Sequence, residues 1–246
     1  MEKTYNSNQN VVKYDMGDKM LVKDENFEWN KFLQPYELAV EDFMLKMEGI
    51  KKQFLLNGKY CPIEIVTGRV KTPNSILDKA TRMGIRFEEI DEKLYDIGGI
   101  RITCKFVEDI YMVADLLKAR KDIVLREERD YVKNPKPSGY RSLHLLCLYN
   151  VETFNGRIPV ILEFQIRTHA MHFWATIEHS VKYKFSKNIP ENIRKRLLIA
   201  SRAAEALDNE MSSIRDAVAA VENGGKPLSS QDPYEREVQI NTIKRW

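Results

Sequence analysis

Between residues 99 and 167 the chain alternates short strand-like runs with two kinds of connection, and this order restricts the fold more than any other feature. Four runs suited to strands cover residues 99–106, 123–131, 141–150 and 158–167. An amphipathic segment, EDIYMVADLLKARK, separates the first two runs, and Asn155-Gly156 between the last two is a hairpin signal. A crossover helix followed by a hairpin predicts an α+β fold with a mixed, mostly antiparallel sheet of about five strands flanked by helices.

Helix-like segments lie on both sides of this region. From Phe27 to Leu56 apolar residues recur at steps of three, four and seven, which predicts a helix that is kinked or restarted at Pro35. Residues 73–83 predict a second helix that ends at Gly84. Residues 87–96 predict a short helix, and the chain turns helical again after residue 167.

The last predicted helix, which begins near Pro190, carries an apolar stripe with two interpretations. Its members repeat at steps of three and four: Leu197, Ala200, Ala204, Leu207, Met211, Ile214, Val218 and Val221. The stripe either packs onto the sheet or forms a seam against another helix, in the same chain or in a second subunit.

Composition bounds the class of protein. Of the 246 residues, 43% are hydrophobic, which is enough for one large core, and the formal net charge of +3 is too small to argue for nucleic acid or membrane binding by itself. Three cysteines form no CxxC pair, and the first residues lack the apolar stretch of a signal peptide, so we expect a cytoplasmic protein. We expect a domain over residues 27–222, with a flexible extension at 1–26 and a flexible tail at 223–246.

Strand alternation places charged side chains together. In residues 158–167, Glu163, Gln165 and Arg167 share one face, and Arg101 and Thr103 share a face of the first strand. Because unpaired buried charge is costly, this polar face is open to water, internally paired, or a binding site.

Three loops favour the binding site. Asp96 and two glycines precede Arg101, and NPKPSGYRSLH spans residues 134–144. VTGRVKTPNS leads into a helix N-terminus, which favours anions. Together the loops and strands supply two carboxylates for Mg²⁺, several cations for phosphates and a tyrosine able to stack on a base. This inventory points to a nucleotide polyphosphate.

Several segments, in order, resemble a known family. They are TGRVK, YDIGGIR, DYVKNPKPSGYRSLH, EFQIRT and MHFWATIEH, and they resemble the synthetase domain of RelA/SpoT-type alarmone enzymes, most closely the small, single-domain members. The similarity runs from about residue 27 to 220 and implies a nucleotidyltransferase-like synthetase fold with long N- and C-terminal helices. The sequence has no His-Asp dipeptide, so we expect synthesis without the hydrolase activity of the long members.

The resemblance implies an activity and partners. The expected reaction is Mg²⁺-dependent transfer of the β,γ-pyrophosphate of ATP to the 3′-hydroxyl of GDP or GTP, with release of AMP, as a stringent-response signal. Small members commonly form homotetramers, so we expect a homo-oligomer. A regulatory RNA or alarmone is a further candidate partner.

The resemblance also implies residue roles. Asp96 and Glu163 match the metal-binding and catalytic carboxylates, with Glu163 as the base that takes the 3′-hydroxyl proton. The matches on the ATP side are Arg69 and Arg101, which clasp adenine, and Lys71, Ser75 and Lys79 near the phosphates. Those on the guanine-nucleotide side are Lys136, Tyr140, which stacks on guanine, His144, Gln165 and Arg167.

Rival interpretations remain open. One is a nucleotidyltransferase that releases pyrophosphate, and another is a non-catalytic module that binds RNA or a partner protein. A zinc site at His169, His172 and His179 is the weaker interpretation of those residues, because HxxH without the HExxH pattern favours packing and polar contacts.

Overall fold

The computed structural model describes residues 11–14, 21–24, 27–185 and 189–222, and its centre is one five-stranded sheet. The strand order is β3-β4-β7-β6-β5. The strands are β3 (Ile65–Val70), β4 (Gly98–Cys104), β5 (Ile123–Asp130), β6 (Leu143–Thr153) and β7 (Gly156–Thr168). Only β4 and β7 pair in parallel, whereas the other neighbours are antiparallel, which confirms the predicted mixed sheet.

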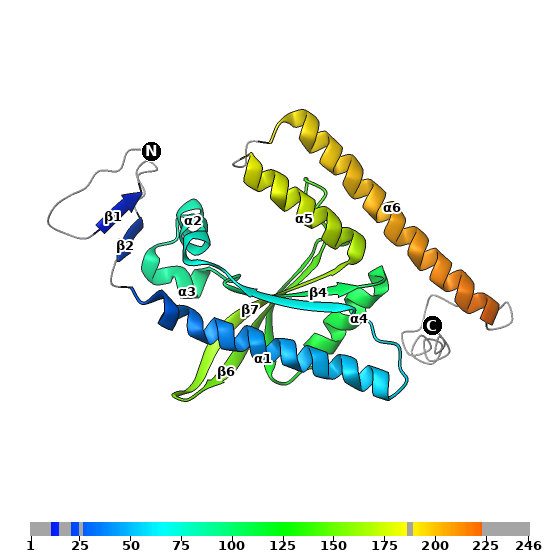
Figure 1. Ribbon diagram of the computed structural model, residues 1–246, viewed down its shortest axis with the longest axis horizontal. Helices are drawn as coiled ribbons and strands as arrows, with labels where there is room; N and C mark the ends of the chain where they lie inside the picture. The colour runs from blue at the N-terminus through cyan, green and yellow to red at the C-terminus, as the bar shows by residue number, and fades with distance from the viewer. Residues whose placement is uncertain (1–10, 15–20, 25–26, 186–188, 223–246) are drawn as a thin grey trace.

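Helices cover both faces of this sheet (Figure 1). α1 (Trp29–Leu56) and α4 (Val107–Lys118) pack on the apolar face, where Phe43 of α1 meets Phe164 of β7 with ring centroids 4.8 Å apart. α5 (His169–Lys184) and α6 (Glu191–Glu222) lie on the other side. α1 continues through Pro35, so the predicted restart at that residue is wrong.

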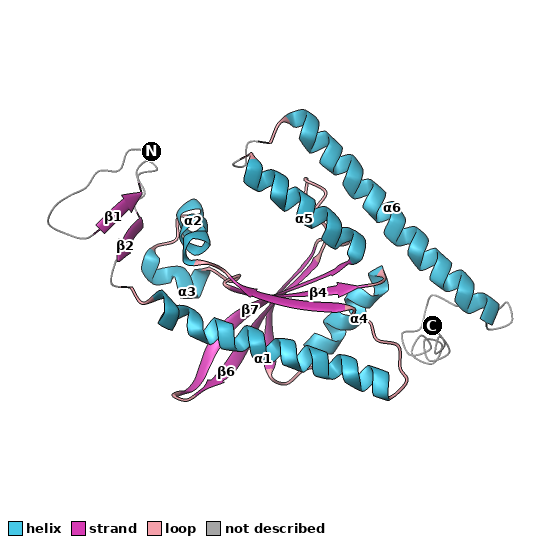
Figure 2. Ribbon diagram, viewed as in Figure 1, coloured by secondary structure: helices cyan, strands magenta, loops and turns pink. Residues whose placement is uncertain are grey.

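The shorter elements follow their sequence signals (Figure 2). α2 (Pro73–Met83) begins after Thr72, whose side chain accepts a hydrogen bond from Ser75 N, and ends at Gly84 in the left-handed region. The short helix predicted before Asp96 is a 3₁₀ turn, Phe87–Glu89, followed by α3 (Ile90–Lys93). A two-residue turn before Gly156 joins β6 to β7, as the Asn-Gly signal predicted.

β3 is not predicted from the sequence, because most of it belongs to VTGRVKTPNS, residues 66–75, which favours a loop. It is an edge strand with only one buried residue, Val66, so its hydrophobic pattern is weak. Gly68 lies where α1 crosses β3, and a Cβ atom there would overlap Val40 Cγ1 and Met44 Sδ. The missing side chain therefore lets helix and strand pack closely.

The chain ends lie mostly outside the described residues. The predicted tail, residues 223–246, lies wholly outside them. Within the predicted extension, residues Val11–Tyr14 (β1) and Leu21–Asp24 (β2) form an antiparallel pair. Among the described residues, no helix combines the length and apolar character needed to cross a membrane.

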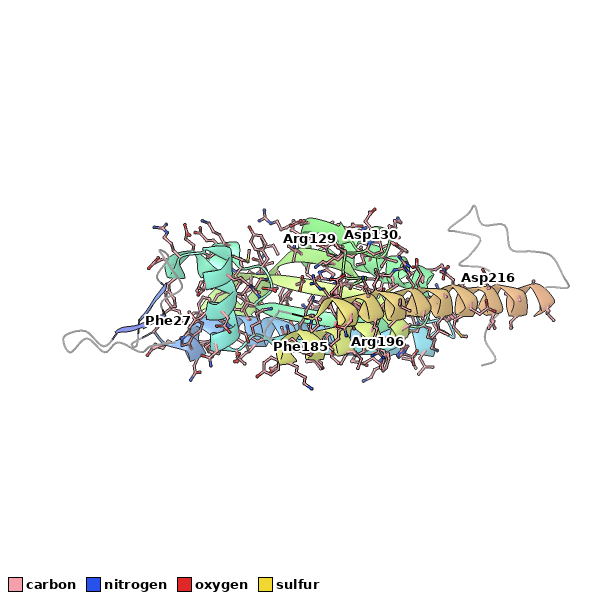
Figure 3. All side chains as sticks on the ribbon, turned by 90° about the horizontal axis from the view of Figure 1, so that it is seen from above. Phe27, Arg129, Asp130, Phe185, Arg196 and Asp216 are labelled. Atoms are coloured by element: carbon pink, nitrogen blue, oxygen red, sulfur yellow. The ribbon has the colours of Figure 1, made fainter. Side chains whose placement is uncertain are left out.

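α6 presents most of its predicted stripe to the outside. Leu207, Met211, Ile214, Val218 and Val221 are 38% to 80% exposed. Figure 3 shows α6 extending past the packed body, with Asp216 on the projecting part. Packing of this stripe onto the sheet, one of its two interpretations, is therefore wrong for residues 207–221.

Candidate active site

The register of three central strands brings polar side chains together on the face opposite α1. In the parallel pair, Gly99 lies opposite Glu163 and Arg101 opposite Gln165. In the β6–β7 pair, His144 lies opposite Gln165. Directly paired residues point to the same face, so Arg101, Gln165 and His144 form one row across the sheet.

A hydrogen-bonded chain of side chains links the predicted acceptor residues. Tyr140 Oη lies 2.8 Å from His144 Nε2, and His144 Nδ1 lies 2.9 Å from Glu163 Oε1. Gln165 Nε2 donates to Glu163 Oε2 at 2.7 Å, and Arg167 donates to Gln165 Oε1. Five predicted site residues therefore form one connected network.

Glu163 is nearly buried, with 9% of its surface exposed. Burial acts to raise its pKa, but the hydrogen bonds from His144 and Gln165 outweigh burial and hold the pKa below its ordinary value. The carboxylate is therefore ionised near neutral pH, as a metal ligand or a proton acceptor must be.

The predicted ATP-phosphate residues surround the second carboxylate. Lys71 Nζ lies 2.8 Å and Lys79 Nζ 2.5 Å from Asp96 Oδ2. Burial acts to raise the pKa of Asp96, but the two ammonium groups outweigh it and lower the pKa. Gly98 and Gly99 follow shortly after Asp96 and begin β4, where Gly99 lies opposite Glu163. Asp96 and its lysines are therefore close to Glu163, and the negative charge of Asp96 acts to raise the pKa of Glu163.

Two predicted ATP-side arginines lie on the two strands on one side of β7 in the strand order. Arg69 lies on β3 and Arg101 on β4, and burial, with the nearby charge of Arg69, lowers the pKa of Arg101. Within the described part of the chain, Nε of Arg101 and Nε of Arg167 are buried without a hydrogen-bond partner. Buried unpaired donors are costly, so these atoms suit an incoming acceptor such as a nucleotide.

The loop between β5 and β6, residues 131–142, carries an aromatic and cationic cluster that we call the β5–β6 loop cluster. It consists of Tyr131, Lys136 and Tyr140. Lys136 Nζ lies 5.0 Å from the Tyr140 ring centre and 4.4 Å from that of Tyr131. Tyr131 also meets the His144 ring edge-on at 5.2 Å. Tyr131 is not among the predicted site residues, although its place at the end of the predicted strand 123–131, next to the loop, was an available signal.

Two further residues were considered in the sequence: Ser75, expected near the ATP phosphates, and His172, one of the three histidines of the zinc interpretation. Ser75 lies in the first turn of α2, where its Oγ accepts a hydrogen bond from Thr72 Oγ1. Burial and the charges of Arg167 and Arg101 lower the pKa of His172, which places that histidine beside the site.

The residues present fit a magnesium ion. Asp96 Oδ1 is buried and has no hydrogen-bond partner among the described residues, and Glu163 supplies a second ionised carboxylate. In the same part of the chain no three His, Cys, Asp or Glu side chains form a metal cluster, which leaves the zinc interpretation of the α5 histidines without support. Two carboxylates completed by substrate phosphates are the usual arrangement for Mg²⁺.

Comparisons with known proteins identify the family of the chain. Residues 68–188 match the family model described as the region found in RelA / SpoT proteins. The chain is 51% identical over 191 residues to the GTP pyrophosphokinase YjbM of Bacillus subtilis, covering 78% of this chain and 90% of that protein. The chain therefore belongs to the RelA/SpoT family.

Within that family the chain is similar to small alarmone synthetases over most of its length. The crystal structure of small alarmone synthetase 1 from Bacillus subtilis bound to its product pppGpp is 52% identical, with a TM-score of 0.76 over 78% of this chain and 98% of that one. The same enzyme bound to AMPCPP matches with 47% identity and a TM-score of 0.69, over 77% of this chain and 97% of that one.

Proposed function

We propose that the chain synthesises (p)ppGpp by transferring the β,γ-pyrophosphate of ATP to the 3′-hydroxyl of GDP or GTP, with release of AMP. The observation that carries the proposal is the position of two ionised carboxylates, Asp96 and Glu163, between a lysine cluster and the β5–β6 loop cluster. The pppGpp-bound and AMPCPP-bound relatives support both nucleotide classes.

On the ATP side, Lys71 and Lys79 bind the phosphates of the nucleotide. The phosphate oxygens either replace Asp96 as the partner of these lysines or share the lysines with Asp96. Arg69 and Arg101 hold the adenine from β3 and β4, and Ser75 adds a hydroxyl at the start of α2. A magnesium ion held by Asp96 and Glu163 would neutralise charge on the β,γ oxygens.

On the acceptor side, Tyr140 stacks on guanine, and Lys136 and Arg167 attract the phosphates. Glu163 accepts the proton of the 3′-hydroxyl at a carboxylate oxygen, and the neighbouring contacts from His144 and Gln165 fix the orientation of that carboxylate. As the 3′-oxygen attacks the β-phosphorus, the bond between that phosphorus and the α,β-bridging oxygen breaks and AMP leaves.

A product assay tests the proposal. The protein is incubated with Mg²⁺, GDP and ATP labelled at the γ-phosphate, and the nucleotides are separated by thin-layer chromatography. We expect label on guanosine tetraphosphate, an equal amount of AMP, loss of turnover with EDTA and recovery with added Mg²⁺. Turnover that persists without metal would remove the metal role of Asp96.

The rival functions give different products in the same assay. A nucleotidyltransferase would release labelled pyrophosphate and no AMP. A non-catalytic module would leave ATP intact with GDP, GTP and GMP alike, and either result would overturn the proposed reaction.

We also propose that the protein is a homo-oligomer, with four subunits as the expected number. The exposed α6 stripe supports this, because a row of apolar residues at heptad spacing is typical of a helix–helix seam. The proposed compartment is the cytoplasm, and regulation by RNA or by an alarmone stays a prediction.

A further inference from the structure

α6 contacts the β5–β6 loop through a buried hydrogen bond. Ser201 Oγ donates to the carbonyl of Gly139 at 2.5 Å, and Ser201 is only 7% exposed. Gly139 directly precedes Tyr140, the proposed guanine-stacking residue. The helix therefore holds the loop backbone one residue away from the aromatic ring that receives the base.

The fit between α6 and the loop is tight at this point. Gly139 has φ +91°, and a Cβ atom on it would lie 2.7 Å from Ser201 Cβ and 3.3 Å from Leu198 Cδ1. Gly139 N donates to Lys136 O at 2.8 Å, and Lys136 N donates to Tyr140 O at 3.1 Å. Because this turn is closed on itself, the restraint on Gly139 extends to Lys136 and Tyr140.

A second contact ties both ends of the loop to the same helix. Arg141 Nη1 lies 2.7 Å from Glu205 Oε1 on α6, and Arg141 Nη2 donates to Val132 O at 2.9 Å. The Arg141 side chain is 12% exposed, so this ion pair is better shielded than an ordinary surface pair. Glu205 thereby acts on the loop start and the loop end through one guanidinium group.

Ser201, Glu205 and Asp208 follow one another at steps of four and three, so they share one face of α6. Asp208 accepts a hydrogen bond from Thr168 Oγ1, directly after Arg167 of β7. This inner face is separate from the exposed stripe that includes Leu207. One helix therefore carries both the contacts to the acceptor side and the apolar seam.

We propose that Ser201 and Glu205 are positioning residues for the acceptor nucleotide. Acting through Gly139 and Arg141, they hold Lys136 and Tyr140 in the geometry that binds the guanine nucleotide. The ATP-side lysines are held separately by Asp96, so their alignment does not depend on these two residues. The inference rests on the proposed function, since it assigns a role in the same reaction.

The test is steady-state kinetics on the full chain with Ser201→Ala and Glu205→Gln. We expect each variant to raise the KM for GDP about 3- to 10-fold, because Ser201→Ala removes one buried hydrogen bond and Glu205→Gln removes the charge from a partly shielded ion pair. The KM for ATP and kcat at saturating GDP should stay within about twofold of wild type. The matched controls, Ser213→Ala and Glu210→Gln, replace exposed residues of the same helix and should change neither KM.

Two kinetic results would contradict the positioning role of Ser201 and Glu205. An unchanged KM for GDP in both variants would overturn the inference, and so would a parallel rise in both KM values, which is what general loosening of the fold would produce. Glu205→Gln keeps the assay informative if Ser201→Ala folds poorly, because the Glu205 side chain is 44% exposed. Failure of the proposed function is separate, since the wild-type protein would then form no guanosine tetraphosphate.

Discussion

Single side chains on the polar face of the sheet are held by their neighbours before any substrate binds. Both oxygens of Glu163 accept contacts, from His144 and from Gln165, and one oxygen of Asp96 lies between two lysines. This arrangement orients the carboxylates without reorganisation at the moment of reaction.

Replacing Glu163 separates binding from chemistry. Glu163→Gln keeps the shape of the side chain but removes its negative charge, so we expect kcat to fall by about 10²–10⁴-fold. The KM values for both nucleotides should change little. Glu152→Gln, at an exposed position of β6, is the control, and retained turnover in Glu163→Gln would remove Glu163 as the base.

Asp109 lies away from the site and makes the free energy of unfolding depend on pH. It is 1% exposed, and Tyr60 Oη and Phe106 N both donate to its Oδ2. Burial raises its pKa to about 6, so the folded state favours the protonated form. The contribution of this carboxyl to stability is therefore lost as pH rises from about 4 through 6.

Asp109→Asn should remove that loss, because the amide oxygen can accept both hydrogen bonds without carrying charge. Between pH 5 and pH 7.5 the wild-type free energy of unfolding should fall by about 1 kcal/mol more than that of the variant. Urea denaturation at the two pH values measures the difference. Asp115→Asn, on the exposed side of α4, should follow wild type, and equal falls in all three proteins would refute the assignment.

The site could be predicted from the sequence only in part. Strand alternation placed Glu163, Gln165 and Arg167 on one face, which the register agrees with. The double lysine contact of Asp96 and the link from Ser201 to Gly139 join segments far apart in the chain, and local patterns carry no information about such pairings.

At the scale of elements, the long periodic helices and the hairpin were predictable, and the edge strand β3 was not. Helix stripes and the Asn-Gly turn are local signals, whereas β3 depends on pairing with β4 and packing against α1. Its identity as a strand is therefore decided by tertiary contacts.

The close packing of α1 against β3 makes the stability of the fold sensitive to substitution at Gly68. Gly68→Ala would force Val40 and Met44 away from β3, at a cost of about 1–3 kcal/mol. Gly49→Ala is the matched control, because a Cβ there meets nothing within 4 Å and the helix gains about 0.5–1 kcal/mol. Thermal unfolding of both variants tests this, and a Gly68→Ala variant as stable as wild type would show that α1 yields without cost.

At the scale of the whole molecule, the exposed stripe on α6 predicts the assembly state. Replacing Leu207 and Ile214 with aspartate places charges in the proposed seam, so we expect a lower mass by light scattering. Asn209→Asp with Ser213→Asp adds the same charge on other exposed positions of α6 and should leave the mass unchanged. An equal mass for the Leu207 and Ile214 variant and wild type would exclude the stripe as the seam.

The single parallel pair in the sheet has a consequence for biosynthesis. Gly99 pairs with Glu163 only after β5, β6 and most of β7 have been made, and the β5–β6 loop is held by Ser201 and Glu205, which come later still. Non-local pairings of this kind form late and slowly in folding. A nascent chain that has reached β4 therefore carries the Asp96–lysine cluster and Arg101 without Glu163, and nucleotide turnover begins only after the chain has been made through Ser201 and Glu205 of α6.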